Sequence, residues 1–460
     1  MRRRAGAPEE RLVRGGGRGG GPPRARLSGP GTGGVMNRPG VTVLLLLAGM
    51  LGAAEPAVVV EQDGGRTGSE IRFRISGLPG PYPYRLLADG SPRRSGEAKA
   101  GDSIAVSPEQ PGFALLSVDY LDEAGKKRTV RAGAGTGWEL IRPARPAPAD
   151  FDAFWAEVRA ELAAVPLRST AKSVPVPERF AGKVAAWDIR VETGSVPVSG
   201  YLAMPAGAAP KSLPALVNFH GAGVRSAAMP LAEAARGILA FDVNAHGIDN
   251  GREAAYYREL DRGELADYRR RDAGDRSRCY YRGMFQRACR ALEYLKSRPE
   301  WDGRILIVSG GSQGGAQALA AAGLDPQVTC CVALVPALCD HHGLLAGRQP
   351  SWPYLIRRRN GVPVDPAVVE SAGYFDCAHF AARVNPEAAC FLSLGLLDTK
   401  CPPSSVCAAF NALKTKHKKL HMAERQGHTL TRDVFGLGDA FIDEHIKAMR
   451  ATHPSQQEKP

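Results

Sequence analysis

Residues 304–315 carry the sequence RILIVSGGSQGG, in which a short apolar run leads directly into a glycine-rich turn around Ser312. The run from Arg304 to Ser309 is typical of a buried strand, and the small residues from Ala316 to Ala322 favour a helix. A serine at such a strand-to-helix turn holds its hydroxyl clear of the backbone, where the helix N-terminus faces developing negative charge. The G-x-S-x-G pattern alone is weak evidence. Its meaning depends on the residues that follow it in the chain.

A candidate acid and a candidate base follow this serine. Asp398 comes directly after the apolar run 391–397, and His428 comes after the strand-like run 419–423. A serine hydroxyl is a poor nucleophile at neutral pH, so it needs an adjacent base that is itself held in the useful tautomer. Serine, acid and then histidine is the chain order of the α/β-hydrolase triad. We therefore predict Ser312 as nucleophile, His428 as general base and Asp398 as the residue that orients the imidazole.

An oxyanion hole is the remaining requirement of this chemistry. The loop 220–223, with the sequence HGAG, follows its own strand-like run at 216–219. One backbone N–H from this loop and the backbone N–H of Gln313 are the expected donors to the oxyanion.

Other ionisable residues compete for these roles. Asp340 also follows a strand and is the main rival to Asp398, and the run Asp340-His341-His342 could suggest a metal pair. We favour Asp398 because its strand directly precedes the strand that leads to His428. We predict that the remaining candidates are surface, core or capping residues: His246, His417, His421, His445, His453, Asp376 and Asp433.

The net charge of +13 does not indicate a nucleic-acid partner. Residues 1–35 contain eight arginines and two glutamates, and they therefore supply about half of the excess. The rest of the chain shows no stripe of lysine or arginine interleaved with aromatic residues. A mildly basic, solvated surface is the expected state.

The N-terminal residues resemble extension and targeting segments. Residues 1–35 are rich in glycine and arginine and are expected to be disordered, with Met36 as an alternative start to Met1. Residues 36–54 have the positive, apolar and small-residue regions of a signal peptide, which predicts a periplasmic or secreted protein without stable membrane insertion after cleavage. An uncleaved membrane anchor is the alternative.

Cysteine usage indicates no metal chemistry. The nine cysteines all lie at or beyond residue 279, and no C-x-x-C pair is present. An odd number implies at least one free thiol, and the disulfide pairing stays open. We expect no metal and no cofactor.

The pattern of apolar residues divides the chain into two folded parts. Residues 55–141 alternate apolar and polar residues in short runs, which predicts a small antiparallel β-sandwich. The Pro-rich segment 142–149 is the expected linker. Strands and helices then alternate through residues 150–450, which predicts an α/β domain with a mostly parallel sheet covered on both faces. An arginine-rich stretch, 258–278, interrupts the alternation as a polar insertion, and 451–460 form a polar tail.

About 300 residues, from Pro146 to the C-terminal helix, resemble carbohydrate esterase family 7, the acetylxylan esterase and cephalosporin C deacetylase group. The resemblance is carried by DFDAFW at 150–155, FHG at 219–221, YYRG at 280–283, GSQGG at 311–315 and GLLDTKCPPS at 395–404. It implies an α/β-hydrolase fold and removal of acetyl groups from small acetylated saccharides such as xylo-oligosaccharides. It also implies Ser312, Asp398 and His428 as the triad, with the backbone amides of Ala222 and Gln313 as the oxyanion hole.

Three departures from the family accompany this resemblance. Ala222 stands where the family usually has tyrosine, and Asn244-Ala245-His246 replaces the family's Arg-Gly-Gln. The first change leaves a backbone amide but alters the packing of the acyl pocket, and the second puts the local loop packing in doubt. The family forms a ring-shaped hexamer, so a homo-oligomer stays open here, because an added N-terminal domain can block those contacts.

Two other functions remain as alternatives. A different α/β-hydrolase, either a peptidase or a broader esterase, would keep the triad and change the substrate. A non-catalytic exported sugar-binding protein would keep the fold without releasing acetate.

Overall fold

The computed structural model describes residues 55–63, 68–359, 362–363 and 365–452. All of these residues belong to one compact unit, Ala53–Pro460. The predicted extension 1–35, the signal peptide 36–54 and residues 453–460 of the predicted tail lie outside the described residues, and so does His453.

The N-terminal strands form two small antiparallel sheets. One sheet has the order β1-β2-β5 and the other the order β4-β3-β6-β7. Alternate residues of β2, namely Ile71, Phe73 and Ile75, are fully buried in a core that both sheets share. This arrangement is the predicted β-sandwich, whose boundaries stay a prediction. The strands are β1 (Ala57–Asp63), β2 (Ile71–Ser76), β3 (Tyr82–Ala88), β4 (Ser91–Ala98), β5 (Ser103–Val106), β6 (Gly112–Leu121) and β7 (Lys127–Thr136).

The rest of the chain is built around a nine-stranded sheet in the order β18-β17-β14-β13-β11-β12-β10-β9-β8. The strands from β18 to β12 in this order pair in parallel, which confirms the predicted mostly parallel sheet of the α/β-hydrolase fold. They are β11 (Leu213–Phe219), β12 (Leu239–Val243), β13 (Trp301–Gly311), β14 (Cys330–Leu334), β17 (Ala389–Gly395) and β18 (Lys418–Ala423).

Three strands at one edge of this sheet were not expected from the sequence. They are β8 (Ser169–Ser173), β9 (Val184–Val191) and β10 (Val198–Pro205), and they pair antiparallel. Antiparallel strands need only short connections. The alternation of strand and helix that marks the parallel strands is therefore missing from this segment.

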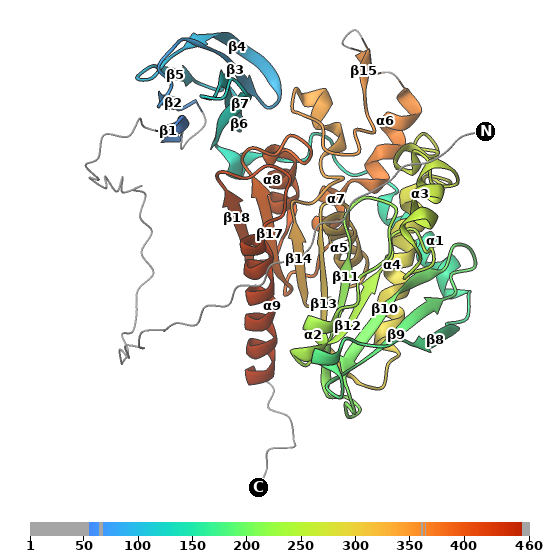
Figure 1. The fold of residues 1–460 in the computed structure, drawn as a ribbon. Helices are drawn as coiled ribbons and strands as arrows, with labels where there is room; N and C mark the ends of the chain where they lie inside the picture. The colour runs from blue at the N-terminus through green and yellow to red at the C-terminus, as the bar shows by residue number, and fades with distance from the viewer. Residues whose placement is uncertain (1–54, 64–67, 360–361, 364, 453–460) are drawn as a thin grey trace, which may run out of the picture. The chain divides into compact units, whose positions relative to one another are not determined.

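Helices cover both faces of the large sheet (Figure 1). Successive residues of β11 alternate between the faces, because Val217 belongs to the larger core cluster and Leu216 to the cluster beneath the C-terminal helix. That helix is α9 (Arg432–Thr452), which packs Ile442 and Ile446 on its side of the sheet. Helices on the larger cluster are α1 (Phe151–Ala163), α4 (Tyr280–Lys296), α5 (Gln313–Leu324) and α8 (Pro403–Ala412).

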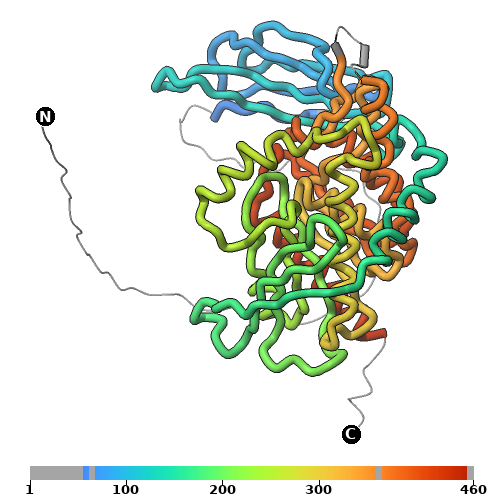
Figure 2. The backbone as a smooth tube through the Cα atoms, turned by 90° about the vertical axis from the view of Figure 1, so that its right-hand side faces the viewer, coloured from blue at the N-terminus to red at the C-terminus, as the bar shows by residue number. Residues whose placement is uncertain are grey.

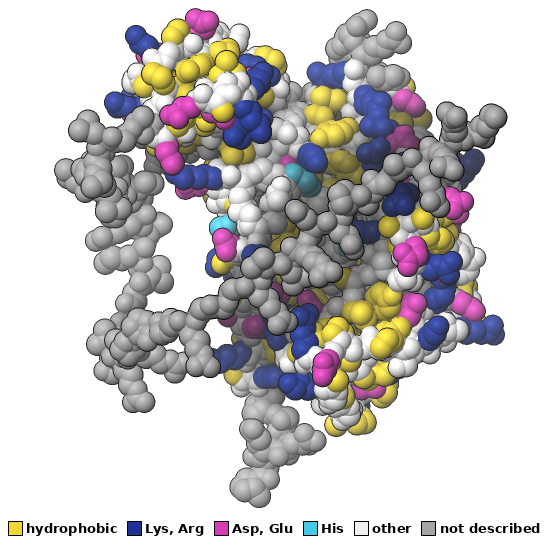
Figure 3. All heavy atoms as spheres, in the orientation of Figure 1, with side chains coloured by type: hydrophobic (Ala, Val, Ile, Leu, Met, Phe, Trp, Pro, Cys, Tyr) yellow, Lys and Arg dark blue, Asp and Glu magenta, His cyan; other side chains and the backbone are white. Residues whose placement is uncertain are grey.

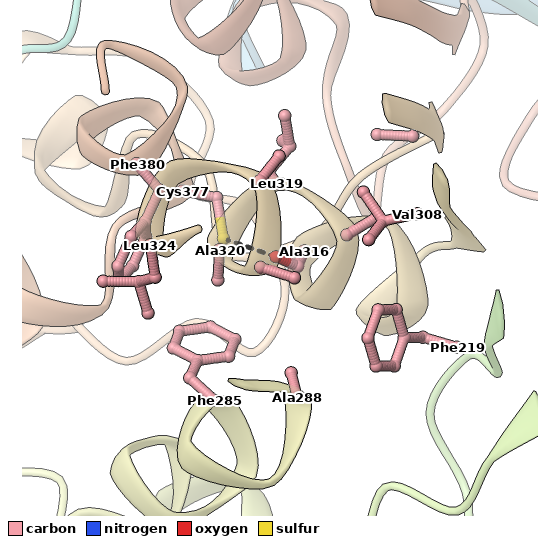
Figure 4. Packing of buried hydrophobic residues seen from close by; sticks show 14 of the residues in the cluster. Phe219, Phe285, Ala288, Val308, Ala316, Leu319, Ala320, Leu324, Cys377 and Phe380 are labelled. Atoms are coloured by element: carbon pink, nitrogen blue, oxygen red, sulfur yellow. Dashed lines mark hydrogen bonds between the residues drawn. The ribbon is translucent and has the colours of Figure 1, made fainter. Parts of the chain in front are cut away.

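Helix α5, which directly follows Ser312, is almost entirely buried. Its small residues allow close contact with Phe285 of α4 and Phe380 of α7 (Cys377–Ala381), as Figure 4 shows. The thiol of Cys377 donates a hydrogen bond to the Ala316 carbonyl at 3.4 Å. All nine cysteines are buried free thiols.

Helix α1 anchors the start of the α/β domain through aromatic packing. It runs along the outside of the helical layer in Figure 2. The Trp155 ring lies beside Phe285 and Phe380, with centroid separations of 6.0 and 5.3 Å, and its indole N–H donates to the Tyr374 carbonyl at 3.0 Å. The apolar residues Phe151, Phe154, Trp155, Val158 and Leu162 recur at helical spacing and form the buried face of α1.

The described surface carries mixed charge. On the face drawn in Figure 3, Lys and Arg side chains are spread among acidic and hydrophobic ones and do not gather into one stripe. Among the described residues, no helix is both long enough and apolar enough to cross a bilayer.

The glycine after Gln313 is required by the close crossing of α5 and β11. A Cβ on Gly314 would lie 1.9 Å from the Phe219 carbonyl oxygen, whereas a Cβ on the exposed helical Gly436 would meet nothing within 4 Å. We expect Gly314→Ala to lower the free energy of unfolding by about 3 kcal/mol or more, since backbone atoms must move. Gly436→Ala, the matched control, should raise it by about 0.5–1 kcal/mol. Urea unfolding of both variants tests this, and equal effects would contradict it.

Candidate active site

Ser312 occupies a strained turn between β13 and α5. Its backbone has φ 57° and ψ −119°, a left-handed conformation that non-glycine residues rarely adopt. Backbone bonds hold it there: the Ser312 N–H donates to the Leu334 carbonyl at 2.8 Å, and the Ser312 carbonyl accepts from Ala337 N–H at 3.0 Å. Such over-determined strain is typical of functional sites. The side chain consequently projects above the carboxyl edge of the sheet.

The structure brings Ser312, His428 and Asp398 together. His428 Nε2 lies 2.8 Å from Ser312 Oγ, and His428 Nδ1 lies 2.8 Å from Asp398 Oδ2. A carboxylate accepts, so Nδ1 carries the proton and Nε2 is free to accept from the serine hydroxyl. The three residues follow β13, β17 and β18, which are parallel strands whose carboxyl ends meet at one edge.

The loop that carries Asp398 is fixed by backbone donors. Asp398 Oδ1 accepts from the N–H groups of Lys400 at 2.8 Å and Cys401 at 3.0 Å, which leaves Oδ2 for the imidazole. The Leu397 N–H donates to the Gln426 carbonyl at 2.9 Å, so the acid loop is tied to the loop that carries His428. The Asp398 carboxylate therefore has one orientation.

The Gly221–Ala222 peptide is held from its carbonyl side. His220 Nδ1 lies 2.6 Å from the Gly221 oxygen, and Nη2 of Arg225 donates to the same oxygen at 3.3 Å. His220 Nε2 accepts from the Ala245 N–H at 3.2 Å, and burial, aided by nearby Arg225, lowers the pKa of His220 to about 4. The imidazole is therefore neutral near pH 7 with its proton on Nδ1, and the carbonyl it holds lies opposite the Ala222 N–H.

Neither predicted oxyanion donor is used within the described protein. The backbone N–H groups of Ala222 and Gln313 make no hydrogen bond to another described residue. The point where a Cβ of Gly221 would lie is 3.6 Å from Ser312 Cβ, so the loop approaches the serine closely. Two such N–H groups beside a nucleophile are suited to an oxyanion.

The rival acid Asp340 lies in a different set of contacts. Its carboxylate is buried against Arg348, with an Nη2 to Oδ2 distance of 2.6 Å, and it accepts from the Ala144 N–H at 2.8 Å. Asp376 caps α7 as expected, but it is buried rather than superficial, because it also accepts from the N–H groups of Asp340 and His341. The Asp340-His341-His342 run therefore builds the core beneath the site.

The other histidines were predicted from the sequence to lie outside the site. His246 is buried beneath the loop 220–223, and His445 on α9 bonds the Thr329 hydroxyl at 3.0 Å. His417, just before β18, is exposed, and His421 within β18 is partly exposed.

The altered Asn244-Ala245-His246 loop is densely bonded. The Asn244 amide donates to the Arg225 carbonyl at 2.8 Å, and its oxygen accepts from the His246 N–H at 2.9 Å. Arg287 of α4 donates to the Ala245 carbonyl at 2.7 Å. The Asn244-Ala245-His246 segment is thus held by well-connected hydrogen bonds.

A cavity of about 900 Å³ opens at Ser312 and His428. Its walls are mixed: Trp352 and Tyr354 provide aromatic surface, and three basic residues, Arg225, Arg269 and Lys400, lie among them. Glu233, Asp242 and Asp439 are the acidic residues among the other lining side chains. Polar and apolar groups line the cavity together, as in most sites that bind small molecules.

One buried thiol lies beside the acid and the base. Ligand atoms of Asp398, Cys401 and His428 lie within 4.8 Å of one another. Burial raises the pKa of the Cys401 thiol well above its usual value. Because metals bind the thiolate, and both other side chains are already paired, this set fits the Ser312 hydrogen-bond chain better than a metal.

Two residues near the site, Arg225 and Tyr268, were not identified from the sequence. Arg225 and His220 orient the oxyanion loop, and Tyr268 contacts it from the arginine-rich insertion. Neither Arg225 nor Tyr268 lies in a motif, and the insertion looked like a solvated segment. Tyr268 is a single tyrosine in the arginine-rich stretch 258–278, and this was the only sequence feature that could have drawn attention to it.

Asp242, which lines the cavity, gives a pH prediction. It is 4% exposed and accepts from the Asn218 amide at 2.6 Å and the Ala228 N–H at 3.1 Å, and burial raises its pKa from 3.8 to about 7. A raised carboxyl pKa stabilises the fold below about pH 4, and this stability is lost as pH rises through 7. Asp242→Asn cannot ionise. We therefore expect its melting temperature, relative to wild type, to rise between pH 5 and pH 8. A difference that does not change with pH would contradict this.

Comparisons with known proteins agree with the geometry. Residues 139–435 match the sequence family described as acetyl xylan esterase (AXE1). The chain is 30% identical over 376 residues to acetyl esterase Axe7A of Xylanibacter ruminicola, which covers 78% of this chain and 82% of the relative.

Solved structures of similar fold include two acetyl xylan esterases. The enzyme from Paenibacillus sp. R4 is 28% identical with a TM-score of 0.57, covering 67% of this chain and 98% of its own. Acetyl xylan esterase 1 from Thermoanaerobacterium sp. JW/SL YS485 is 24% identical with a TM-score of 0.54, covering 67% and 97%, and supports the fold alone. From the match over most of the α/β domain and the identity to Axe7A, we conclude that the chain belongs to the acetyl xylan esterase family.

Proposed function

We propose that this protein is a serine esterase that removes acetyl groups from acetylated saccharides such as xylo-oligosaccharides. The observation that carries the proposal is the unbroken chain Ser312 Oγ, His428 and Asp398, with both hydrogen bonds at 2.8 Å, at a cavity with mixed polar and apolar walls. The printed activities of the relatives, acetyl esterase and acetyl xylan esterase, support acetyl as the acyl group.

The proposed reaction proceeds through an acetyl-enzyme. Ser312 Oγ attacks the acetyl carbonyl carbon while His428 Nε2 accepts the hydroxyl proton. The negative oxygen of the tetrahedral intermediate is bound by the N–H groups of Ala222 and Gln313. The intermediate collapses as the C–O bond to the sugar breaks, and His428 donates its proton to the departing sugar oxygen. Water, deprotonated by His428, then attacks the acetyl carbonyl carbon; the Ser312 Oγ–C bond breaks, acetate leaves, and His428 returns the proton to Ser312 Oγ.

The space beside the nucleophile supports a small acyl group. A Cβ on Gly311 would lie 2.4 Å from Cδ1 of Leu430, so this leucine packs directly over the strand end next to Ser312. Leu430 and Trp352 both line the cavity. An acetyl group needs little room beside Leu430, and a longer acyl chain needs more.

We expect Ser312→Ala to lower kcat on 4-nitrophenyl acetate by about 10⁴-fold or more, since the nucleophile is lost while the fold remains. Wild-type protein should release acetate from acetylated xylo-oligosaccharides, and its kcat/KM should fall from acetyl to butyryl aryl esters. Acetate release from cephalosporin C and from glucose pentaacetate is measured alongside.

The alternatives predict different results. Hydrolysis of peptides or long acyl esters without acetyl preference would favour another α/β-hydrolase. Sugar binding without acetate release would favour the non-catalytic reading. If Ser312→Ala kept substantial activity, the proposed mechanism would be wrong.

We also propose that the protein is exported. The predicted signal peptide 36–54 supports this, although it lies outside the described residues. If the protein is exported, N-terminal sequencing of the mature chain should begin near Glu55. Retention of residues 36–54 on a membrane-bound product would favour the anchor instead.

A further inference from the structure

Buried side chains hold the loop 220–223 through a series of hydrogen bonds. His246 Nε2 lies 3.2 Å from the Gly223 carbonyl, and its Nδ1 lies 2.7 Å from the Tyr280 hydroxyl. Burial, aided by His220, lowers the pKa of His246 to about 3, so the imidazole is neutral. A carbonyl only accepts, so the single imidazole proton is on Nε2, and the one Tyr280 O–H lies between two acceptors, His246 Nδ1 at 2.7 Å and the Ala245 carbonyl at 3.1 Å.

The chain continues through Tyr268 to Gln313. The Gly223 N–H donates to the Tyr268 oxygen at 3.2 Å, and the Tyr268 hydroxyl donates to Gln313 Oε1 at 3.0 Å. Gln313 is fully buried, and Tyr268 is only 4% exposed. Burial raises the pKa of Tyr268, so its hydroxyl keeps the proton that it donates.

Packing fixes the direction of this phenol. The Tyr268 ring lies edge-on to His246 with centroids 4.6 Å apart, and it lies 4.8 Å from Tyr280. These rings stand on separate elements, because Tyr268 begins a 3₁₀ turn (Tyr268–Arg270) in the insertion and Tyr280 begins α4. The hydroxyl therefore has little freedom to leave either partner.

Each bond restrains a particular peptide plane. The Gly223 N–H belongs to the Ala222–Gly223 peptide, which Tyr268 holds, while His220 and Arg225 hold the preceding Gly221–Ala222 peptide. Ala222 is thus restrained on both sides. The same Tyr268 hydroxyl also bonds the side chain of Gln313, whose backbone N–H is the second proposed oxyanion donor.

We propose that Tyr268 is a positioning residue that sets the spacing between the two halves of the oxyanion hole, through Gly223 on one side and Gln313 on the other. This inference rests on the proposed function. It assigns to the arginine-rich insertion a part in transition-state stabilisation, acting where Ala222 replaces the family's tyrosine.

Tyr268→Phe tests the proposal, because it removes the hydroxyl and keeps the ring packing. We expect kcat on 4-nitrophenyl acetate to fall about tenfold with KM nearly unchanged, less than the 10²–10³-fold loss typical of removing a direct oxyanion donor. Tyr256→Phe is the matched control: its ring packs beside Tyr257 on α3 (Ala254–Arg262), and Tyr256 does not line the cavity. The control should keep wild-type kcat.

Inhibition by a small trifluoromethyl ketone distinguishes a positioning role from a purely structural one. Its adduct with Ser312 places a negative oxygen in the hole, so its inhibition constant should rise by the same factor as kcat/KM falls. Gln313→Met, which lacks Oε1, should reproduce the loss, and the double variant should be no worse than the poorer single variant. Assays run well below the melting temperature of every variant.

The outcomes separate this inference from the proposed function. If Tyr268→Phe keeps kcat within twofold of Tyr256→Phe, or if kcat falls while ketone inhibition is unchanged, the positioning role is overturned. Additive effects of the two substitutions would overturn it as well. An active Ser312→Ala variant would instead overturn the proposed function itself.

Discussion

The backbone at Ser312 is the constraint on which the rest of the site depends. A residue at φ 57° and ψ −119° does not stay there unaided, because an L side chain rarely adopts this conformation. The parallel strands on both sides supply the restraint, since Leu334 at the end of β14 accepts the Ser312 N–H and Gly314 fits against the end of β11. The same strands present the loops of Asp398 and His428 at the same edge. The order of the strands in the sheet therefore determines both the backbone conformation of Ser312 and the positions of the loops that carry Asp398 and His428.

The hydrogen bonds around Ser312 separate the roles of side chains and backbone. Side chains such as Asp398 and His220 have both polar ends occupied, so each has one tautomer or orientation. The N–H groups of Ala222 and Gln313 are left without partners among the described residues. An unpaired donor in a protein interior is costly, and it is retained where a ligand or intermediate satisfies it. In the proposed reaction, these unused donors bind the negative oxygen of the intermediate.

Much of the fold and of the candidate site could be predicted from the sequence. The elbow, the parallel strands and the order of Ser312, Asp398 and His428 are local patterns, because strand, turn and helix each have their own residue signals. The antiparallel edge β8 to β10 was missed, since a strand pair without a helix between its members lacks the alternating pattern. The contacts of Arg225 and Tyr268 were missed for another reason. They join segments far apart in the chain, and no local pattern indicates which side chain will reach a loop.

The neutral groups around the oxyanion loop have an electrostatic consequence. A protonated His220 or His246 would add a second fixed cation beside Arg225, at a cost that burial makes large. Both imidazoles are neutral. The guanidinium of Arg225, which carries a full positive charge, donates hydrogen bonds to the Gly221 and Ala222 carbonyls of this loop. A cation on a peptide oxygen polarises that peptide, and the N–H at its other end becomes a stronger donor. The Gly221–Ala222 peptide can therefore pass part of the charge of Arg225 toward the oxyanion, while the guanidinium itself stays on the exposed side of the loop.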